Sequence, residues 1–297
     1  MKLATLSVEG DPCAAVQIAN GSWLNIKAAD TSLGSLQSII ENGDTALPVL
    51  RKLIAEADAG QHAEAVVTDA VLLAPTPQPR KNVFCVGRNY AEHIAEGDRA
   101  QKQNVGVSEH PVYFTKPPTS VVAPDGDILV FPQLSTSIDY EVELAVVIGK
   151  PGRNISKEAA FEHIFGYTIL NDITARDVQR RHGGQYFKGK GLDGSCPLGP
   201  WIVTADAISD PHNLSIGLTV NGEQRQDGST ADLIFDIPTL IASLSEGMTL
   251  EPGDIIATGT PSGVGYAMEP PRFLADGDTV VCTISEIGEL RNSVRNA

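Results

Sequence analysis

Three carboxylates alternate along one short segment of the sequence. Asp139, Glu141 and Glu143 directly precede the apolar run at residues 144–148. Side chains two residues apart in a strand point to the same face, so the three charges would lie together and repel each other. An oxygen-liganded Mg²⁺ or Mn²⁺ would offset that repulsion. The segment therefore predicts either a metal site or a solvated acidic edge strand.

A fourth carboxylate, Asp172, ends the apolar stretch at residues 166–171. The stretch predicts a buried strand, and catalytic carboxylates often protrude from a sheet at such a strand end. An aspartate at this position can equally cap the helix that follows. Asp172 is therefore a possible partner for the acidic segment, contributed by a second strand.

Two further sequence patterns supply candidate acid–base groups and cations for a reacting site. His93 and Glu96 lie three apart in a short predicted helix, where they would share a face and form a pair able to take a proton from water. Lys188 and Lys190 lie among glycines, which lets a cation approach a carboxylate or an enolate closely. A plain surface pair and a lysine-bearing surface turn are the alternatives.

Residues 258–265 form a loop rich in glycine and hydroxyl groups after a predicted strand at 254–257. Its amides and hydroxyls can bind an anionic group. The loop has no Gly-Lys-Ser/Thr ending, and no G-x-G-x-x-G motif opens a helix after a strand. Nucleotide binding is therefore not supported.

The elements that must position these residues are mostly short strands separated by glycine and proline turns, which favours a β-rich roll or barrel. Three prolines at residues 75–79 block a helix, so we place a domain boundary there. The sequence predicts a small α+β domain at 1–74 and a catalytic domain at 75–297. Strands are expected at 2–7, 14–18, 82–86, 112–116, 128–131 and 140–148, and helices at 36–42, 47–56, 90–96, 157–164, 175–181 and 237–244.

Composition narrows the possible partners and location. A formal net charge of −15 repels a polyanion, so nucleic acid is not expected as a partner. The longest apolar runs are far shorter than the roughly 20 residues needed to cross a bilayer. The first residues lack the apolar region of a secretory signal, so a cytoplasmic location is expected.

Five segments, in this order, resemble the fumarylacetoacetate hydrolase family over roughly residues 80–294. They read VGRNYAEH at 86–93, DYEVEL at 139–144, NDITARD at 171–177, GK at 189–190 ahead of CPLGP at 196–200, and GTPSGVG at 259–265. One such motif can arise by chance, but five in this order are specific. The resemblance favours the metal-site interpretation over the solvated alternatives.

The resemblance implies a fold and a set of roles. The fold is an α+β, β-rich mixed β-sandwich roll, usually a homodimer, with the N-terminal region as a variable addition. Glu141, Glu143 and Asp172 match the ligands of Mg²⁺ or Mn²⁺, and Asp139 a supporting residue. The resemblance also implies catalytic roles for Lys190 and for the His93–Glu96 dyad, which lies on a lid. It implies substrate binding by Arg88, Tyr90 and Thr260 and, less directly, by Lys188. Gly191 departs from the pattern, because many members have serine there.

This family acts on small 2-oxo-carboxylates through metal-stabilised enolates. The presence of both His93 and Glu96, which can activate water, favours hydrolysis of a C–C bond in an acylpyruvate. Fumarylpyruvate or maleylpyruvate from aromatic catabolism would give pyruvate and a carboxylic acid. The alternatives are an oxaloacetate decarboxylase, a hydroxymuconate-type isomerase or decarboxylase, a dehydratase of sugar-derived 2-oxo acids, and a non-catalytic protein with the same fold.

Overall fold

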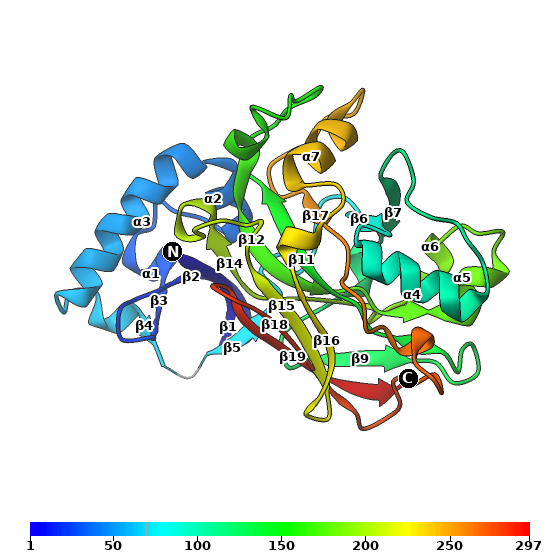
Figure 1. Cartoon of the computed structure of the whole chain (residues 1–297). Coiled ribbons are helices and arrows are strands. Elements are labelled where there is room, and N and C mark those ends of the chain that lie inside the picture. Colours follow the sequence, from blue (N-terminus) through cyan, green and yellow to red (C-terminus); the bar gives the residue numbers. More distant parts are fainter. Residues whose placement is uncertain (69) are drawn as a thin grey trace.

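The computed structural model describes residues 1–68 and 70–297, and most of its regular structure is β-strand (Figure 1). A large mixed sheet and a five-stranded sheet pack against each other, and most of the helices lie at the two sides of this pair. The β-rich α+β fold expected from the sequence is confirmed.

The large sheet contains twelve strands. Its main path runs β4 (Val66–Val67), β3 (Trp23–Asn25), β2 (Asp11–Gln17), β1 (Lys2–Val8), β14 (Cys196–Thr204), β12 (Ile164–Asn171), β11 (Val142–Ile148), β17 (Ile255–Ala257), β6 (Val83–Gly87) and β7 (Val112–Lys116). Off this path, β5 (Val71–Leu73) pairs with β1, and β8 (Val121–Val122) pairs with β14. Over the described residues the two ends, β4 and β7, do not pair, so the sheet is not a closed barrel.

The smaller sheet covers one face of the large one. Its order is β16 (Glu223–Ser229), β15 (Ser215–Val220), β18 (Thr279–Ile284), β19 (Gly288–Asn296) and β9 (Asp127–Val130). Even-numbered residues of β11, such as Leu144 and Val146, join the core between the sheets. Glu143, Ala145 and Val147 are of the opposite parity and therefore face the other side, away from the smaller sheet.

Seven helices are present in the described chain: α1 (Ile26–Ala29), α2 (Leu36–Glu41), α3 (Gly43–Asp58), α4 (Ala91–Gln101), α5 (Arg176–Arg181), α6 (Phe187–Lys190) and α7 (Ile237–Ser245). The helix expected at 157–164 is wrong. Only a 3₁₀ turn, Ala160–His163, forms there, because Ile164 already begins β12 and pairs with Ile148 of β11.

The N-terminal strands are continuous with the rest of the large sheet. Strand β1 pairs with β14, with Leu3 opposite Ile202. The apolar cluster around α2 and α3 also takes in Val147, Phe165 and Ile202 from the C-terminal part. The boundary near residue 74 stays a prediction, and the two parts share both a sheet and a core. Within the described ranges, no helix combines the length and apolar character needed to cross a membrane.

Candidate metal centre and active-site cavity

Glu141, Glu143 and Asp172 bring their carboxylates together, with oxygen atoms within 4.8 Å of one another. All three side chains are buried. The pairing of β11 with β12 explains this meeting, because Val142 lies opposite Asn171 and so places the two acidic segments side by side. The structure therefore gathers the three residues that the resemblance implies as metal ligands.

Asp139 does not join this acidic triad of Glu141, Glu143 and Asp172. The expected single strand is broken, since β10 (Ile138–Asp139) pairs with β13 (Thr174–Ala175) and ends before β11 begins. Asp139 Oδ2 instead accepts a hydrogen bond from Arg176 Nε at 2.9 Å, and its Oδ1 accepts one from the Gly265 amide at 2.7 Å. The expectation of three carboxylates on one face of one strand is wrong, because Asp139 is already satisfied elsewhere.

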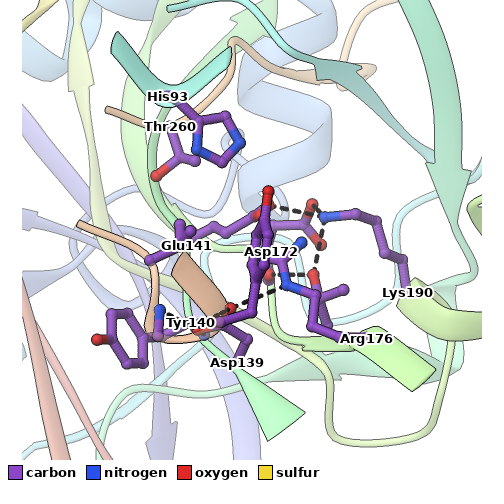
Figure 2. Close-up of polar contacts among 12 residues, drawn as sticks. His93, Asp139, Tyr140, Glu141, Asp172, Arg176, Lys190 and Thr260 are labelled. Carbon is purple, nitrogen blue, oxygen red and sulfur yellow. Dashed lines mark hydrogen bonds and ion pairs between the residues drawn. The ribbon is translucent and has the colours of Figure 1, made fainter. Parts of the chain in front are cut away.

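Two buried lysines compensate part of the triad's charge (Figure 2 shows one of them, Lys190). Lys190 Nζ donates to Glu141 Oε2 at 2.7 Å and to Asp172 Oδ2 at 2.5 Å. Burial disfavours its charged form, but the charges of Asp172 and Glu141 outweigh burial and raise the pKa of Lys190. Lys116, which the sequence analysis missed, is fully buried and donates to Asp172 Oδ1 at 2.7 Å.

Glu141 and Glu143 differ in their electrostatic setting. Burial alone would raise the pKa of Glu141, but Arg176 and Lys190 lower it well below its usual value. Burial, together with the charges of Asp172 and Glu141, raises the pKa of Glu143 well above its usual value. Among the described residues, the Glu143 carboxylate has one hydrogen-bond donor, the Gly259 amide at 2.8 Å, and no ion-pair partner.

This donor set fits a hard divalent cation. Three buried carboxylates offer the oxygen ligands that Mg²⁺ and Mn²⁺ prefer, and Glu143 is the one that forms no ion pair within the described part of the chain. A cation at the triad would favour the ionised form of Glu143. The triad can therefore hold such an ion.

The His93–Glu96 pair lies on α4 beside the cavity. His93 Nδ1 lies 2.9 Å from Glu96 Oε1, and Glu96 Oε2 accepts a hydrogen bond from the Gly263 amide at 2.8 Å. A carboxylate can only accept, so Nδ1 carries a proton and, in the neutral ring, Nε2 remains a proton acceptor. In Figure 2, His93 lies above Glu141 and Asp172, and Asp139 lies below them.

The glycine-rich loop after β17 binds acidic groups of the protein itself. The amides of Gly259, Gly263 and Gly265 donate to Glu143, Glu96 and Asp139, respectively. Thr260 Oγ1, in the same loop, accepts a hydrogen bond from Gln226 Nε2 at 2.8 Å. The loop thus fixes the triad and the His93–Glu96 pair relative to each other.

These groups surround an open cavity of about 340 Å³. Of the residues expected in the site, it is lined by Arg88, His93, Glu141, Glu143, Lys190 and Thr260. Arg88 is held in a left-handed backbone conformation (φ 62°), and its Nη2 donates to the Gly106 carbonyl at 3.2 Å.

Two predicted substrate contacts are not part of the cavity lining. Lys188 is exposed on α6, and the Tyr90 side chain is buried with a hydroxyl that has no hydrogen-bond partner among the described residues. Their positions lend no support to a direct substrate contact.

Other polar residues at the site were missed. Arg176, Gln179, Arg180 and Tyr266 line the cavity, and Gln226 supports Thr260 from behind. Arg176 lies four residues after Asp172, so its position in the same motif was an available signal. Gln226 is the one buried residue of β16, whose residues EQRQDGS are otherwise exposed or half-buried, so the sequence carries no signal that distinguishes it from its neighbours.

Comparison with known proteins links this site to a family. The family profile described as fumarylacetoacetate (FAA) hydrolase C-terminal matches residues 82–295. Oxaloacetate tautomerase YisK of Bacillus subtilis (strain 168) is 47% identical over 271 residues, which cover 89% of this chain and 88% of that protein. The mitochondrial oxaloacetate tautomerase FAHD2A of Homo sapiens is 43% identical over 276 residues, which cover 92% of this chain and 84% of that protein.

Solved structures are similar over the full chain. A fumarylacetoacetate hydrolase (EaFAH) from psychrophilic Exiguobacterium antarcticum has 42% identity and a TM-score of 0.83, with 100% of both chains covered. A maleylpyruvate hydrolase from Sphingobium sp. SYK-6 has 31% identity and a TM-score of 0.77, again with 100% of both chains covered.

Proposed function

Because the chain belongs to the fumarylacetoacetate hydrolase family, we propose that it is a divalent-metal-dependent enzyme that interconverts the keto and enol forms of oxaloacetate. One observation carries the choice of reaction: the high identity, over most of both chains, to a bacterial protein named as an oxaloacetate tautomerase. The buried acidic triad and the adjacent proton acceptor supply chemistry that such a reaction needs.

Tautomerisation requires the loss of a proton from C3 and stabilisation of negative charge on the 2-oxo oxygen. A divalent ion held by Glu141, Glu143 and Asp172 would supply Lewis-acid polarisation of that oxygen. The Lys190 ammonium lies against the same triad and remains charged, so it adds positive potential where the enolate charge develops.

His93 is the residue proposed to move the proton. Its Nε2 is the acceptor left by the Nδ1 contact to Glu96, and its side chain lines the cavity. Glu96 holds the ring in that tautomer and stabilises the imidazolium that forms when Nε2 takes the proton. In ketonisation the enol first loses its hydroxyl proton to solvent, and the transfer of a proton from His93 to C3 then completes the reaction; in enolisation solvent returns that proton to the oxygen.

Thr260 is proposed to orient the substrate. Its oxygen already accepts from Gln226, so its hydroxyl proton is available to donate to the C1 carboxylate of the substrate, at the metal end of the cavity. Substrate held at both the triad and Thr260 would present C3 toward His93.

Hydrolysis of an acylpyruvate is the second candidate. It is favoured by the similarity to a solved maleylpyruvate hydrolase and by the His93–Glu96 pair, which can also take a proton from water. Its support is weaker, because the more similar curated relatives are named as oxaloacetate tautomerases. A homodimer, a cytoplasmic location and a role in aromatic catabolism stay predictions.

A substrate panel tests the proposal. Enol oxaloacetate is mixed with the protein and Mg²⁺, the ultraviolet absorbance of the enol is followed, and pyruvate is measured separately. We expect faster loss of the enol without matching pyruvate release. Fumarylpyruvate and maleylpyruvate are assayed in parallel. Turnover of these two substrates alone would indicate that the enzyme is a hydrolase and not a tautomerase. Pyruvate formed from oxaloacetate at the rate of enol loss would instead indicate a decarboxylase.

A further inference from the structure

We infer that Arg180 binds the distal carboxylate of a four-carbon 2-oxo-dicarboxylate and so selects dicarboxylic over monocarboxylic substrates. The inference rests on the proposed function. It starts from the cations that line the cavity, which are Arg88, Arg176, Arg180 and Lys190.

Three of these four cations are already engaged. Arg176 contacts Asp139 and Glu141, at 2.9 and 2.5 Å. Lys190 contacts Glu141 and Asp172. Arg88 Nη2 lies 3.6 Å from Asp98 Oδ1 and also donates to the Gly106 carbonyl. Arg88 therefore connects α4 to the segment that follows it.

Arg180 is different. Over residues 1–68 and 70–297 it has neither an ion pair nor a side-chain hydrogen bond, although it lines the cavity and is exposed. In a chain with a net charge of −15, an unpaired guanidinium at the mouth of an acidic site is unusual and is available to an anionic ligand.

The position of Arg180 suits a ligand that begins at the triad. Arg176 and Arg180 lie one turn apart on α5, and their Cζ atoms lie 4.4 and 5.4 Å from the centroid of the same Tyr266 ring. The Tyr266 amide donates to Asp139 Oδ2 at 3.0 Å, which anchors the backbone that carries this ring. Arg176 is buried and contacts Glu141 of the triad, whereas Arg180 is exposed. Arg180 therefore lies nearer the outer end of the cavity.

The chemistry of the substrate requires a partner at that distance. The C1 carboxylate and the 2-oxo group of oxaloacetate would occupy the metal end, which leaves the C4 carboxylate near the outer part of the cavity. An unpaired carboxylate there would lose hydration without compensation. Arginine offers two parallel N–H donors that match a carboxylate, which the neutral side chain of Gln179 beside it cannot do.

The test uses Arg180→Gln, which removes the charge, with Arg181→Gln as the matched control. Arg181 lies on the same helix and carries the same charge, but it contacts Asp177 at 3.8 Å and does not line the cavity. Three probes are compared in the presence of Mg²⁺: oxaloacetate, its 4-methyl ester, and oxalate, which resembles only the metal-chelating end. Apparent affinities come from thermal-shift titrations, and KM and kcat from the enol assay.

We expect Arg180→Gln to weaken oxaloacetate binding about tenfold or more and to raise KM more than it lowers kcat. Affinities for the 4-methyl ester and for oxalate should stay within about twofold of the wild type, and Arg181→Gln should change none of the three. Unchanged oxaloacetate affinity in Arg180→Gln would overturn the inference. Equal loss for oxaloacetate and oxalate would overturn it as well, since the arginine would then act on the whole site.

The binding measurements separate this inference from the proposed function. If wild-type protein prefers oxaloacetate to its 4-methyl ester and Arg180→Gln removes the preference, Arg180 is the selecting residue even if oxaloacetate is not turned over. If wild-type protein turns over enol oxaloacetate but binds the ester equally well, the proposed function stands and the role of Arg180 is rejected.

Discussion

The charges around the triad are balanced by side chains that come from distant parts of the chain. Lys116 ends β7, is fully buried, and donates to Asp172 Oδ1 and to the main-chain carbonyls of Ile173 and Lys190. It therefore joins the segment that carries Asp172 to the segment that carries Lys190. A buried lysine with three acceptors acts as a positioning residue for both.

Replacing Lys116 by methionine should lower the free energy of unfolding of the metal-free protein by about 3 kcal/mol, because it removes one partner of a buried ion pair. Chemical denaturation in the presence of a chelator measures this. Lys150→Met is the control, since Lys150 forms an exposed pair with Asp44 at 3.5 Å and should contribute less than about 1 kcal/mol. Equal stability of the two variants would show that Lys116 does not hold the triad.

Some of these residues were predictable from the sequence and others were not. The spacing of Glu141 and Glu143 before an apolar run predicted that they lie together, although only Glu143 lies within β11, and Asp172 follows the end of an apolar run. Lys116 lies 56 residues from Asp172, and a lone lysine at a strand end is normally exposed. Only the antiparallel pairing of β6 with β7 and the parallel pairing of β6 with β17 bring it to the site.

At the scale of elements, α4 is the part that completes the cavity. Glu96 connects the helix to the glycine-rich loop by accepting a hydrogen bond from the Gly263 amide. Gly97 leaves no room for a side chain, because a Cβ atom there would lie 2.5 Å from Tyr266 Oη. Glycine at this position allows the helix to lie close to the ring that supports Arg176 and Arg180.

Gly97→Ala should therefore displace Tyr266 and raise the KM for oxaloacetate several-fold. The stability change should be small, since alanine favours a helix by about 1 kcal/mol and offsets part of the strain. Steady-state kinetics and thermal unfolding measure the two effects. The control, Ala95→Gly on the exposed face of α4, should lower stability by about 0.5–1 kcal/mol and leave KM unchanged. An unchanged KM in Gly97→Ala would refute this role of the close contact.

Sequence patterns located most elements but not their interruptions. The turn signals and the alternation of apolar residues were sufficient for strands such as β1, β6 and β7. Strand β14 contains Pro197 and Pro200, which argue against a central strand, yet it pairs with both β1 and β12. The break at Tyr140 and Glu141 depends on Arg176 and the loop amides binding Asp139, and such long-range contacts are not visible in local patterns.

For the whole molecule, the N-terminal part is a structural extension of the catalytic part. Strand β1 covers the edge of β14, and the α2–α3 cluster covers Val147, Phe165 and Ile202. An uncovered strand edge and an exposed apolar cluster both promote association of chains.

Deletion of residues 1–74 should therefore yield a fragment that aggregates, or that unfolds at a much lower temperature than the full chain. Solubility, circular dichroism and thermal unfolding of residues 75–297 measure this. The control is the full chain cleaved at a protease site introduced near residue 77, whose two pieces should stay associated and folded. A fragment of 75–297 that alone unfolds cooperatively, at the temperature of the full chain, would mean that the predicted boundary separates independent domains.

The central claim is that a divalent ion held by Glu141, Glu143 and Asp172 is required for turnover of a 2-oxo acid. The most direct measurement is the rate of enol oxaloacetate loss with protein stripped by a chelator, before and after Mg²⁺ or Mn²⁺ is restored, in the wild type and in Glu143→Gln. We predict no acceleration by the stripped protein, recovery by the wild type on adding the ion, and at least about 100-fold less recovery by Glu143→Gln at the same ion concentration. Full turnover by the stripped wild type, or equal recovery by both proteins, would contradict the claim.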